Sequence, residues 1–483
     1  MEKIGKREFL KRAGVLAAGC VAESVLARSA NLTRSEARIA QSGTDIAQSA
    51  AGAAQSGAGT GGHRTNWAGN LTFSTDNLQL PGTLGDVQQA VKSAGKLRAL
   101  GSRHSFNAIA DSRYEQVSLA RMVDIALDER AKTVTVGGGV TYALLAPWLD
   151  ARGWALHNLA SLPGITVAGA CATATHGSGT QNGNLATAVV GLELVKANGE
   201  VVHLTRAKDG DNFLGAVVGL GAVGLVTHTT LAVQPAYQVA QTVYENLSFD
   251  ELGKNFEAIY ASGYSVSVFT DWQNHRATQL WVKKRLGAGG SSNAIQWPET
   301  MYGATKATQK LHPLAGHDAT SCTDQMGIPG PWYDRLPHFR IGQTPSSGQE
   351  LQSEYLVPFE DGFKAVLAVE KLSDRIGPHL FVTELRVIAA DDFWMSTARE
   401  RLSLAVHFTW KPEWDAVRAL LPAIEEQLRP FAPRPHWGKL FTMAPRELAS
   451  RYARLKEFKA LLAEYDPSGK FRNEFVSTNL YAG

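Results

Sequence analysis

The stretch Ala99-Leu100-Gly101-Ser102-Arg103-His104-Ser105-Phe106-Asn107 leads from a short apolar strand into a turn of small residues. Backbone N–H groups in such a turn can converge on a pyrophosphate, and Arg103 adds a fixed positive charge. His104 would then lie at the edge of the molecule to which the phosphate belongs. A histidine in a turn is more often a surface or packing residue, so this stretch needs support from elsewhere in the chain.

That support comes from a second run of small residues, Ala160-Ser161-Leu162-Pro163-Gly164-Ile165-Thr166-Val167-Ala168-Gly169-Ala170-Cys171-Ala172-Thr173-Ala174-Thr175-His176-Gly177-Ser178-Gly179. Together the two runs resemble the flavin-binding domain of the vanillyl-alcohol-oxidase superfamily. The resemblance implies that the cofactor is FAD, attached covalently through His104. It also implies that FAD is bound by Ala99, Leu100, Gly101, Ser102, Arg103, His104, Ser105, Ser161, Thr166, Gly169, Ala172, Thr173, Gly177 and Val226.

Length and composition narrow the class of protein. A chain of 483 residues is too long for one ordinary core, so two domains are expected. The 48 basic and 45 acidic residues nearly balance and form no arginine-rich stripe, which argues against a nucleic-acid partner. With 44% apolar residues and 46 glycines, the chain suits a turn-rich α+β enzyme. Its three cysteines cannot form a disulfide framework and lack metal-ligand spacing, so no metal site is expected and Cys171 is expected to pack in the core.

The first residues are interpreted as a targeting segment, 1–30. A basic stretch, Lys6 to Arg12, precedes an apolar stretch, Ala13 to Ala22, that is too short to span a bilayer. The pattern resembles a twin-arginine export signal in which Lys6 replaces the first arginine. It predicts export to the periplasm or the medium, with cleavage near residues 27–29 or lipid attachment at Cys20 as alternatives. An uncleaved amphipathic N-terminus is the remaining alternative.

The predicted linker covers residues 31–62, of which residues 39–62 repeat Ala-Gln-Ser three times among Gly, Ala and Thr and contain almost no large side chains. Such a segment cannot bury enough apolar area to offset its ordering entropy, so a flexible linker is predicted.

Residues 63–235 are predicted to form the FAD-binding domain, with strands alternating with short helices. The Asn198-Gly199 pair indicates a hairpin turn. The expected elements are a helix from Gly82 to Ala94, a strand 96–100, a strand 132–136, a helix 141–152 begun by Thr141, the hairpin strands 189–195 and 200–204, and a strand 222–233.

Residues 236–430 differ from the preceding domain because long aromatic-rich segments alternate with Pro- and Gly-rich loops. They are predicted to form an antiparallel-sheet cap that binds substrate. The expected strands are 266–272, 279–284, 380–388 and 402–409. Residues 431–483 are expected to pack back on the FAD domain, as they do in the superfamily. The predicted fold class is therefore α+β, a two-domain flavoprotein of vanillyl-alcohol-oxidase type with a PCMH-like FAD domain and a cap.

Two pairs of polar residues are candidates for substrate chemistry. Strand periodicity places Glu384 and Arg386 on one face, and it places His407 and Thr409 on one face with Phe408 on the other. A buried carboxylate requires a partner such as a guanidinium. Either pair alone also fits a solvated ion pair or polar pair on an outer sheet face, but their occurrence with the flavin motifs favours a site.

Lys439 follows Trp437 by two residues in the run Pro435-His436-Trp437-Gly438-Lys439, so the two side chains share a face if the segment is extended. The length of substrate that the enzyme prefers is expected to depend on side chains within 269–281 and 333–355, which line the cap.

These motifs, with residues 65–70 and 384–392, are similar to the bacterial alditol (xylitol) oxidases over essentially all of 66–483. The resemblance implies catalytic roles for Glu384, His407, Arg386 and Lys439. It implies polyol binding by Ser161, Glu384, Arg386, Thr409 and Lys439, with His407 behind them. One departure is visible next to the flavin: Gly164 and Thr166 stand where the family pattern has a histidine and a serine.

The activity that this resemblance implies is oxidation of a terminal CH2OH of an alditol such as xylitol or sorbitol. A base in the Glu384/His407 region takes the hydroxyl proton while hydride moves to the flavin. O2 then reoxidises the flavin, giving an aldose and H2O2. A monomer with no integral membrane span is expected.

Three alternative functions are considered, and the choice between oxidase and dehydrogenase is a separate open question. An aldonolactone oxidase or dehydrogenase, of L-gulono-1,4-lactone type, shares the His-Trp-x-Lys motif and the cap. An oxidase and a dehydrogenase differ in whether oxygen can reach the flavin beside Ala160 and Ser161. Ala160 is small but carries a methyl group, so the sequence does not distinguish the two. A flavin-free polyol-binding protein would be colourless. A structural envelope role lacks exposed repeats beyond the linker.

Overall fold

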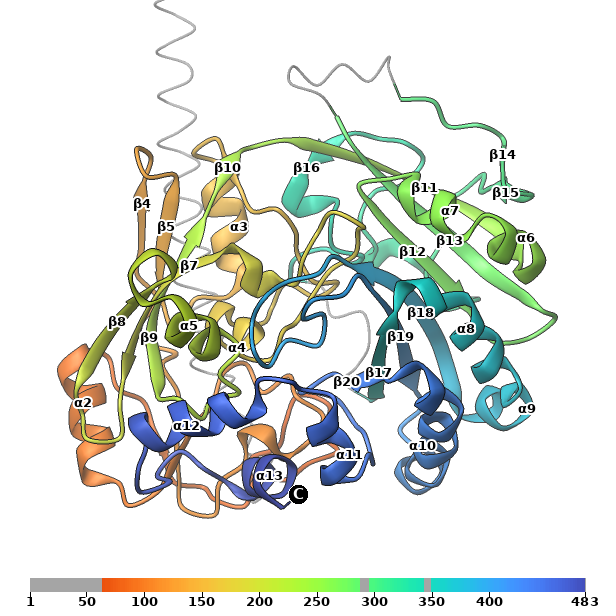
Figure 1. Ribbon diagram of the computed structural model, residues 1–483. Coiled ribbons are helices and arrows are strands. Elements are labelled where there is room, and N and C mark those ends of the chain that lie inside the picture. Colours follow the sequence, from red (N-terminus) through yellow and green to blue (C-terminus); the bar gives the residue numbers. More distant parts are fainter. Residues whose placement is uncertain (1–62, 287–294, 343–348, 483) are drawn as a thin grey trace, which may run out of the picture. The chain divides into compact units, whose positions relative to one another are not determined.

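The computed structural model describes residues 63–286, 295–342 and 349–482. The predicted leader and linker, 1–30 and 31–62, lie outside these residues, as does Cys20. The described chain is built around one five-stranded and one ten-stranded sheet, with small two- and three-stranded sheets beside them (Figure 1).

The five-stranded sheet is antiparallel throughout and lies in the predicted FAD-binding part of the chain. In spatial order it consists of β4 (Ile125–Asp128), β5 (Thr133–Gly137), β9 (Leu225–Ala232), β7 (Val189–Val195) and β8 (Val201–Thr205). The small sheets consist of β1 (Leu78–Gln79), β3 (Glu115–Val117) and β2 (Leu97–Ala99), and of β6 (Trp154–Ala155) and β10 (Gln234–Pro235).

The two helices predicted for this half are present, and each begins within two residues of its expected start. Thr83 and Asp86 form a reciprocal capping box at the start of α2 (Leu84–Ser93). The hydroxyl of Thr141 accepts from the N–H of Leu144 at the start of α3 (Tyr142–Asp150). The remaining helices of this half are α4 (Val167–Ala172) and α5 (Arg206–Val217), neither of which was predicted.

The predicted hairpin is confirmed. Strands β7 and β8 pair antiparallel, and the turn between them places Gly199 at φ 85°, which a glycine adopts without steric cost. The predicted strand 222–233 begins later than expected, at Leu225, because the residues before it turn through positive φ at Leu220, Gly221 and Gly224. Cys171 lies in the core, as predicted.

The ten-stranded sheet contains every strand predicted for 236–430, together with long strands that were not predicted. Its spatial order is β14 (Thr300–Met301), β15 (Ala304–Lys306), β11 (Gln238–Ser248), β13 (Arg276–Arg285), β12 (Ser265–Thr270), β18 (Leu380–Ile388), β19 (Ser403–Trp410), β17 (Leu351–Pro358) and β20 (Arg434–Pro435). Strand β16 (Gly330–Pro331) pairs with β11 off this path.

The two faces of this sheet have different chemistry. Leu385 and Val387 of β18, with Val406 and Phe408 of β19, pack into an apolar core beneath a layer of helices. The intervening residues of the same strands face the opposite way, as the period of two requires. The covering helices are α6 (Phe249–Lys254), α7 (Phe256–Ala261), α8 (Gly362–Glu370), α9 (Ser373–Ile376) and α10 (Trp414–Leu428) (Figure 1).

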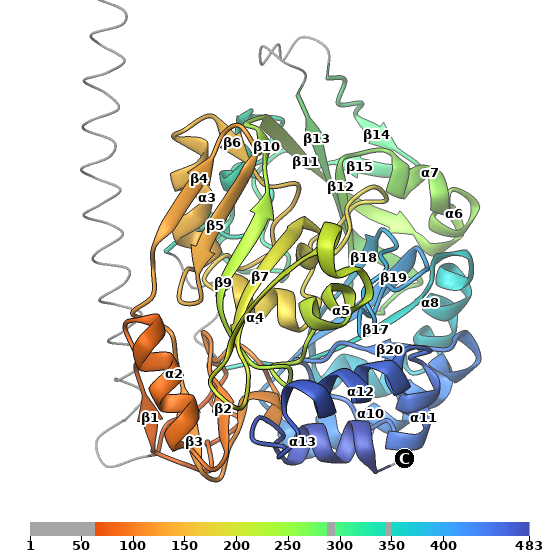
Figure 2. The same ribbon diagram turned by 60° about the vertical axis from the view of Figure 1, so that its left-hand side comes forward.

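The C-terminal segment packs against the first half of the chain. Phe458 and Leu461 join the core that contains Phe213 and Ala216 of α5 (Figures 1 and 2). The helices of this segment are α11 (Pro445–Ser450), α12 (Leu455–Tyr465) and α13 (Glu474–Val476).

A buried arginine ties this segment to the strand that precedes the His104 turn. The guanidinium of Arg98 donates to the carbonyls of Ile109, Leu220, Gly221 and Phe471. Burial lowers the pKa of Arg98 to about 9. Four carbonyls from three separate segments therefore depend on one side chain.

No helix in the described part of the chain is both long enough and apolar enough to cross a bilayer.

A histidine between two carboxylates on the five-stranded sheet gives stability a pH dependence. His228 lies 2.7 Å from Glu193 and 3.0 Å from Asp124, and His203 lies 3.6 Å from the other oxygen of Glu193. Burial lowers the pKa of His228, but the two carboxylates outweigh burial and raise it overall. The stabilisation is complete below the unfolded-state pKa, near 6.5, and is lost as pH rises through the raised folded value.

We therefore expect His228→Gln to lower Tm more at about pH 5.5 than at about pH 8.5, because only the protonated imidazole gains from the two carboxylates. Thermal unfolding of the two proteins at both pH values measures the difference. An equal loss of Tm at both pH values would contradict it.

Candidate active site

One large cavity lies between the His104 turn, the 160–176 run and the polar face of the ten-stranded sheet. It encloses about 1910 Å³ of space, its open mouth included. The six residues predicted to handle substrate all line it: Ser161, Glu384, Arg386, His407, Thr409 and Lys439.

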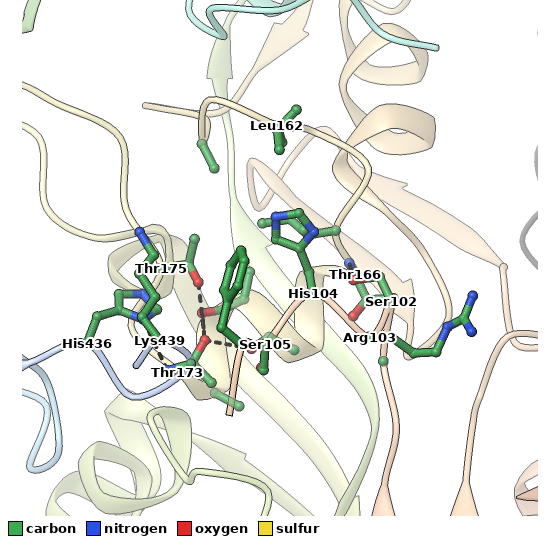
Figure 3. A pocket seen from close by; sticks show the side chains of 18 of the residues that line it. Ser102, Arg103, His104, Ser105, Leu162, Thr166, Thr173, Thr175, His436 and Lys439 are labelled. Carbon is green, nitrogen blue, oxygen red and sulfur yellow. Dashed lines mark hydrogen bonds between the residues drawn. The ribbon is translucent and has the colours of Figure 1, made fainter. Parts of the chain in front are cut away.

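The His104 turn offers unused backbone donors to this cavity. Within the described residues, no group accepts a hydrogen bond from the N–H groups of Gly101, Ser102, His104 or Ser105. Arg103 adopts a left-handed conformation, φ 62°, that shapes the turn. Figure 3 shows His104 and Ser105 at the cavity, with His436 and Lys439 also beside it. The turn thus has the free donors that an anionic cofactor group requires.

His104 itself is held as a neutral imidazole. Its ring lies 4.4 Å from that of Trp67 and 6.0 Å from that of Phe106, centroid to centroid. Burial, together with the charge of Lys439, lowers the pKa of His104 to about 4. A neutral ring keeps a nitrogen lone pair, which bond formation to a cofactor requires.

The structure brings the predicted FAD-binding residues to the cavity with one exception. Gly177 does not line it, and a Cβ at this position would lie 2.5 Å from the carbonyl oxygen of Leu159 and 2.6 Å from the amide of Asn158. The Arg103 side chain points away from His104 and donates to the carbonyl of Thr65, so the positive charge that it adds is directed away from His104 (Figure 3). The others line the cavity: Ala99, Leu100, Gly101, Ser102, Arg103, His104, Ser105, Ser161, Thr166, Gly169, Ala172, Thr173 and Val226.

The two departures from the family pattern fit locally. Gly164 has open space around it, so the shorter side chain leaves no strained contact. Thr166 packs closely on Gly101, where a Cβ would lie 2.6 Å from the threonine hydroxyl. Thr166 therefore requires a glycine at position 101.

Sheet register places three polar side chains in one row. Glu384 of β18 lies opposite His407 of β19, and His407 lies opposite Glu354 of β17. Residues paired in this way have Cβ atoms about 4.5–5.5 Å apart. The predicted pairs Glu384/Arg386 and His407/Thr409 both face the cavity, which rules out the alternative of an outer, solvated face.

Glu354 is the charged centre of the site. Its side chain is completely buried and contacts Lys439 Nζ at 2.8 Å, Arg386 Nη2 at 2.9 Å and His176 Nε2 at 3.3 Å. Burial alone would raise the pKa of Glu354, but Lys439, His176 and Arg386 outweigh burial and hold the pKa well below its usual range. Glu354 is therefore a carboxylate that holds two cations at the cavity wall.

His407 has both ring nitrogens in use. Nδ1 lies 2.6 Å from Lys439 Nζ, and Nε2 lies 3.1 Å from the hydroxyl of Thr409. Since an ammonium can only donate, Nδ1 accepts and the proton is on Nε2. Burial and Lys439 lower the pKa of His407 to about 4, so the ring is neutral.

Glu384 has one oxygen engaged and one open. Oε1 accepts from His338 Nε2 at 2.7 Å, whereas Oε2 lies 3.5 Å from Arg386 Nε. Burial alone would raise the pKa of Glu384, but Arg386 and His338 outweigh it and hold the pKa well below its usual range. Arg386 also lies 3.5 Å from the hydroxyl of Ser161, which joins the 160–176 run to the sheet.

Lys439 does not share a face with Trp437, because the segment turns and so does not meet the condition of running extended. Lys439 N–H donates to the carbonyl of His436. Trp437 is fully buried and donates to the carbonyl of Met395, while Lys439 reaches into the cavity. The turn sends the two side chains into different surroundings.

Sequence reasoning missed Glu354, His338 and His176 as site residues. For Glu354 a signal exists: polar Glu350, Gln352 and Glu354 alternate, as on a half-polar strand, and all line the cavity. His338, like these three, falls within 333–355, the range expected to line the cap.

Two family models match the chain, an FAD binding domain over residues 75–205 and a D-arabinono-1,4-lactone oxidase model over residues 345–479. Alditol oxidase of Streptomyces sp. (strain IKD472 / FERM P-14339) is 45% identical over 416 residues, which cover 85% of this chain and 97% of that protein. The chain belongs to the alditol oxidase family of FAD-dependent oxidoreductases.

Relatives at lower identity include L-gulono-1,4-lactone dehydrogenase of Mycobacterium tuberculosis (strain ATCC 25618 / H37Rv). It is 30% identical, over 85% of this chain and 97% of that protein. L-gulonolactone oxidase of Mus musculus is 24% identical, over 86% of this chain and 98% of that protein. Aldonolactone enzymes are therefore relatives, but at lower identity than the alditol oxidase.

The fold is similar to that of a solved cholesterol oxidase. Cholesterol oxidase from B. sterolicum matches with a TM-score of 0.70 at 14% identity, over 86% of this chain and 96% of that one. This confirms the predicted fold class, an FAD-binding domain of PCMH type with a cap of antiparallel sheet. The free donors of the His104 turn and a cavity of about 1910 Å³, its open mouth included, fit FAD at this site.

Proposed function

We propose that this enzyme oxidises the terminal CH2OH of open-chain alditols such as xylitol and sorbitol to the aldose, with O2 reduced to H2O2. The observation that carries the proposal is the polar row Glu384–His407–Glu354 facing the cavity with Arg386 and Lys439. Such a wall offers donors and acceptors at many points, which suits a flexible chain of hydroxyls. The His104 turn and the 160–176 run would hold FAD, which would supply a hydride acceptor for the substrate carbon and a route for the electrons to O2.

Arg386 and Lys439 stabilise the negative charge that develops on the reacting oxygen. The Nε–H of Arg386 is buried at the cavity and, among the described residues, has no hydrogen-bond acceptor. Lys439 is held by Glu354 and His407, so its ammonium is oriented before substrate arrives. Fixed donors in a buried site stabilise such charge without reorganisation.

Glu384 receives the hydroxyl proton in this proposal. His407 has no free lone pair, because Lys439 and Thr409 occupy its two nitrogens. Glu384 Oε2 is the carboxylate oxygen left open beside Arg386. His407 does not take the proton in this proposal. Its Nε2–H donates to the hydroxyl of Thr409 and orients that hydroxyl toward the substrate.

The decisive experiment is oxygen uptake with peroxide detection on the purified protein, with xylitol, sorbitol, glycerol and L-gulono-1,4-lactone compared side by side. Peroxide from the open-chain polyols but not from the lactone supports the proposal. Preferred turnover of the lactone would move the protein to the aldonolactone enzymes, to which the second family model and the more distant relatives belong. Anaerobic bleaching by a polyol without oxygen uptake would make it a dehydrogenase.

We also propose that His104 carries FAD covalently, since its neutral imidazole lies at the cavity beside the free backbone donors. We expect His104→Ala to fold but to release flavin on acid precipitation, and its flavin to be reduced more slowly by xylitol. Unaltered protein should keep the yellow colour in the pellet. Flavin released equally from both proteins would contradict the covalent bond.

Export is proposed from the basic and apolar leader, residues 1–30. In a bacterial host, the full chain should reach the periplasmic or extracellular fraction, and replacing Lys6 and Arg7 with glutamine should retain it in the cytoplasm. Fractionation followed by activity measurement tests this. Equal distribution of both proteins would contradict a twin-arginine-like signal.

A further inference from the structure

His436 lines the cavity, but the mechanism above gives it no role. It directly follows β20, and its backbone N–H donates to the carbonyl of Glu354 at 3.0 Å. The pairing of β17 with β20 therefore adds His436 to the polar row Glu384–His407–Glu354, at the end away from Glu384. Figure 3 shows the His436 side chain beside Lys439 at the cavity.

The two ring nitrogens of His436 have different surroundings. The N–H of Gly438 donates to Nδ1 at 3.1 Å. A nitrogen that accepts a hydrogen bond carries no proton, so the proton of the ring is on Nε2. Burial and the charge of Lys439 lower the pKa of His436 well below its usual range, in agreement with a neutral ring.

The Nε2–H group of His436 opens into the cavity. Among the described residues none accepts a hydrogen bond from it, yet Nε2 does not belong to the unpaired side-chain atoms that the protein seals off completely. The residue as a whole is only 4% exposed, and the surface that it keeps is at the cavity that it lines. A donor in so enclosed a place is costly unless a bound molecule supplies an acceptor.

His436 lies between the two segments that carry the predicted FAD-binding residues. On one side, the ring of His176, at the end of the 160–176 run, lies 6.1 Å from its own ring, centroid to centroid. On the other side is the His104 turn: a Cβ on Gly438 would lie 3.2 Å from Ser105 Oγ and 3.5 Å from His436 Cε1. The free N–H is therefore at the cofactor's part of the cavity.

The segment that carries His436 is fixed to the His104 turn. The N–H of Phe106 donates to the carbonyl of Gly438 at 2.7 Å. The amide nitrogen of Asn107 donates to the carbonyls of Trp437 and Lys439, at 2.9 and 2.7 Å. The imidazole is thus oriented by contacts with the same turn that presents His104. A donor fixed in this way stabilises charge without reorganisation.

We propose that His436 is a flavin-binding residue: its Nε2–H donates a hydrogen bond to an acceptor atom of the flavin and stabilises the negative charge that the flavin gains on reduction. A hydrogen bond to a charged acceptor is about twice as strong as one to a neutral acceptor. The contact therefore favours the reduced flavin over the oxidised one and raises its reduction potential. The assignment concerns the cofactor and does not depend on which alcohol the enzyme oxidises.

Two substitutions separate the roles of the two nitrogens. An asparagine side chain accepts readily from the backbone N–H two residues on, so His436→Asn keeps the contact with Gly438 and loses the donor at the position of Nε2. A glutamine places its amide nitrogen near the position of Nε2, so His436→Gln keeps that donor. His379→Gln, at a surface histidine paired with Glu413, is the control.

The experiment measures the reduction potential of the flavin in the purified holoenzymes, without substrate, by slow anaerobic reduction in the presence of a reference dye. We expect His436→Asn to make reduction about 10-fold less favourable, which for a two-electron couple is a potential lower by about 30 mV. His436→Gln should recover most of this difference. His379→Gln should have the potential of the unaltered enzyme.

The outcomes separate this assignment from its alternatives. Equal potentials in all four proteins would overturn it, and so would an equal decrease in His436→Asn and His436→Gln. An unaltered potential in His436→Asn with a raised KM for xylitol would show that the N–H contacts substrate, which overturns the flavin contact as well. If the unaltered enzyme oxidises no alditol, the proposed function fails, but the potentials still decide the role of His436.

Discussion

Replacing Glu354 with glutamine is expected to lower kcat/KM for xylitol by about 10³-fold, because it removes the one charge that holds two cations at the cavity wall. Lys439 and Arg386 contact this carboxylate at 2.8 and 2.9 Å, and its side chain has no solvent exposure. An amide of the same size cannot neutralise them. Both cations would then be less well oriented toward the oxygen on which charge develops.

The measurement is oxygen uptake, with the anaerobic rate of flavin reduction as a second readout. Glu425→Gln is the matched control, since Glu425 is also a buried glutamate but accepts from neutral groups, Tyr355 and Thr442. The control should alter Tm without a comparable loss of kcat/KM. If Glu354→Gln stays within about threefold of unaltered enzyme while fully loaded with flavin, Glu354 has no role in holding the cations.

Replacing Glu384 with glutamine is expected to lower kcat by about 10²–10⁴-fold, the usual contribution of a positioned general base. The glutamine carbonyl can still accept from His338, so the local packing is kept. The amide cannot take up the hydroxyl proton, and it removes the negative charge beside Arg386. Because the loss affects the chemical step more than binding, KM should change much less than kcat.

Stopped-flow reduction of the flavin by xylitol under anaerobic conditions measures that step directly. Glu384→Asp keeps the charge and should recover part of the rate, which a purely structural role would not predict. A Glu384→Gln enzyme that reduces its flavin at a near-normal rate would show that another group accepts the proton.

The sequence by itself determined the local parts of this protein. The small residues of 99–107, the period of two in Glu384/Arg386 and His407/Thr409, and the Asn198-Gly199 turn each act over a few residues. Backbone sterics and strand geometry decide such features without distant contacts. For that reason the cofactor domain, the hairpin and the faces of β18 and β19 could be predicted.

Only the tertiary structure decided which of these pieces meet. Strand β17 precedes β18 in the chain but pairs with β19, which places Glu354 beside His407. His338 reaches Glu384 because Lys283, on another strand, fixes the carbonyls before it. The turn at Trp437 sends Lys439 into the cavity against the expected alternation. Strand order and loop position depend on contacts between residues far apart in the chain, and no local pattern encodes them.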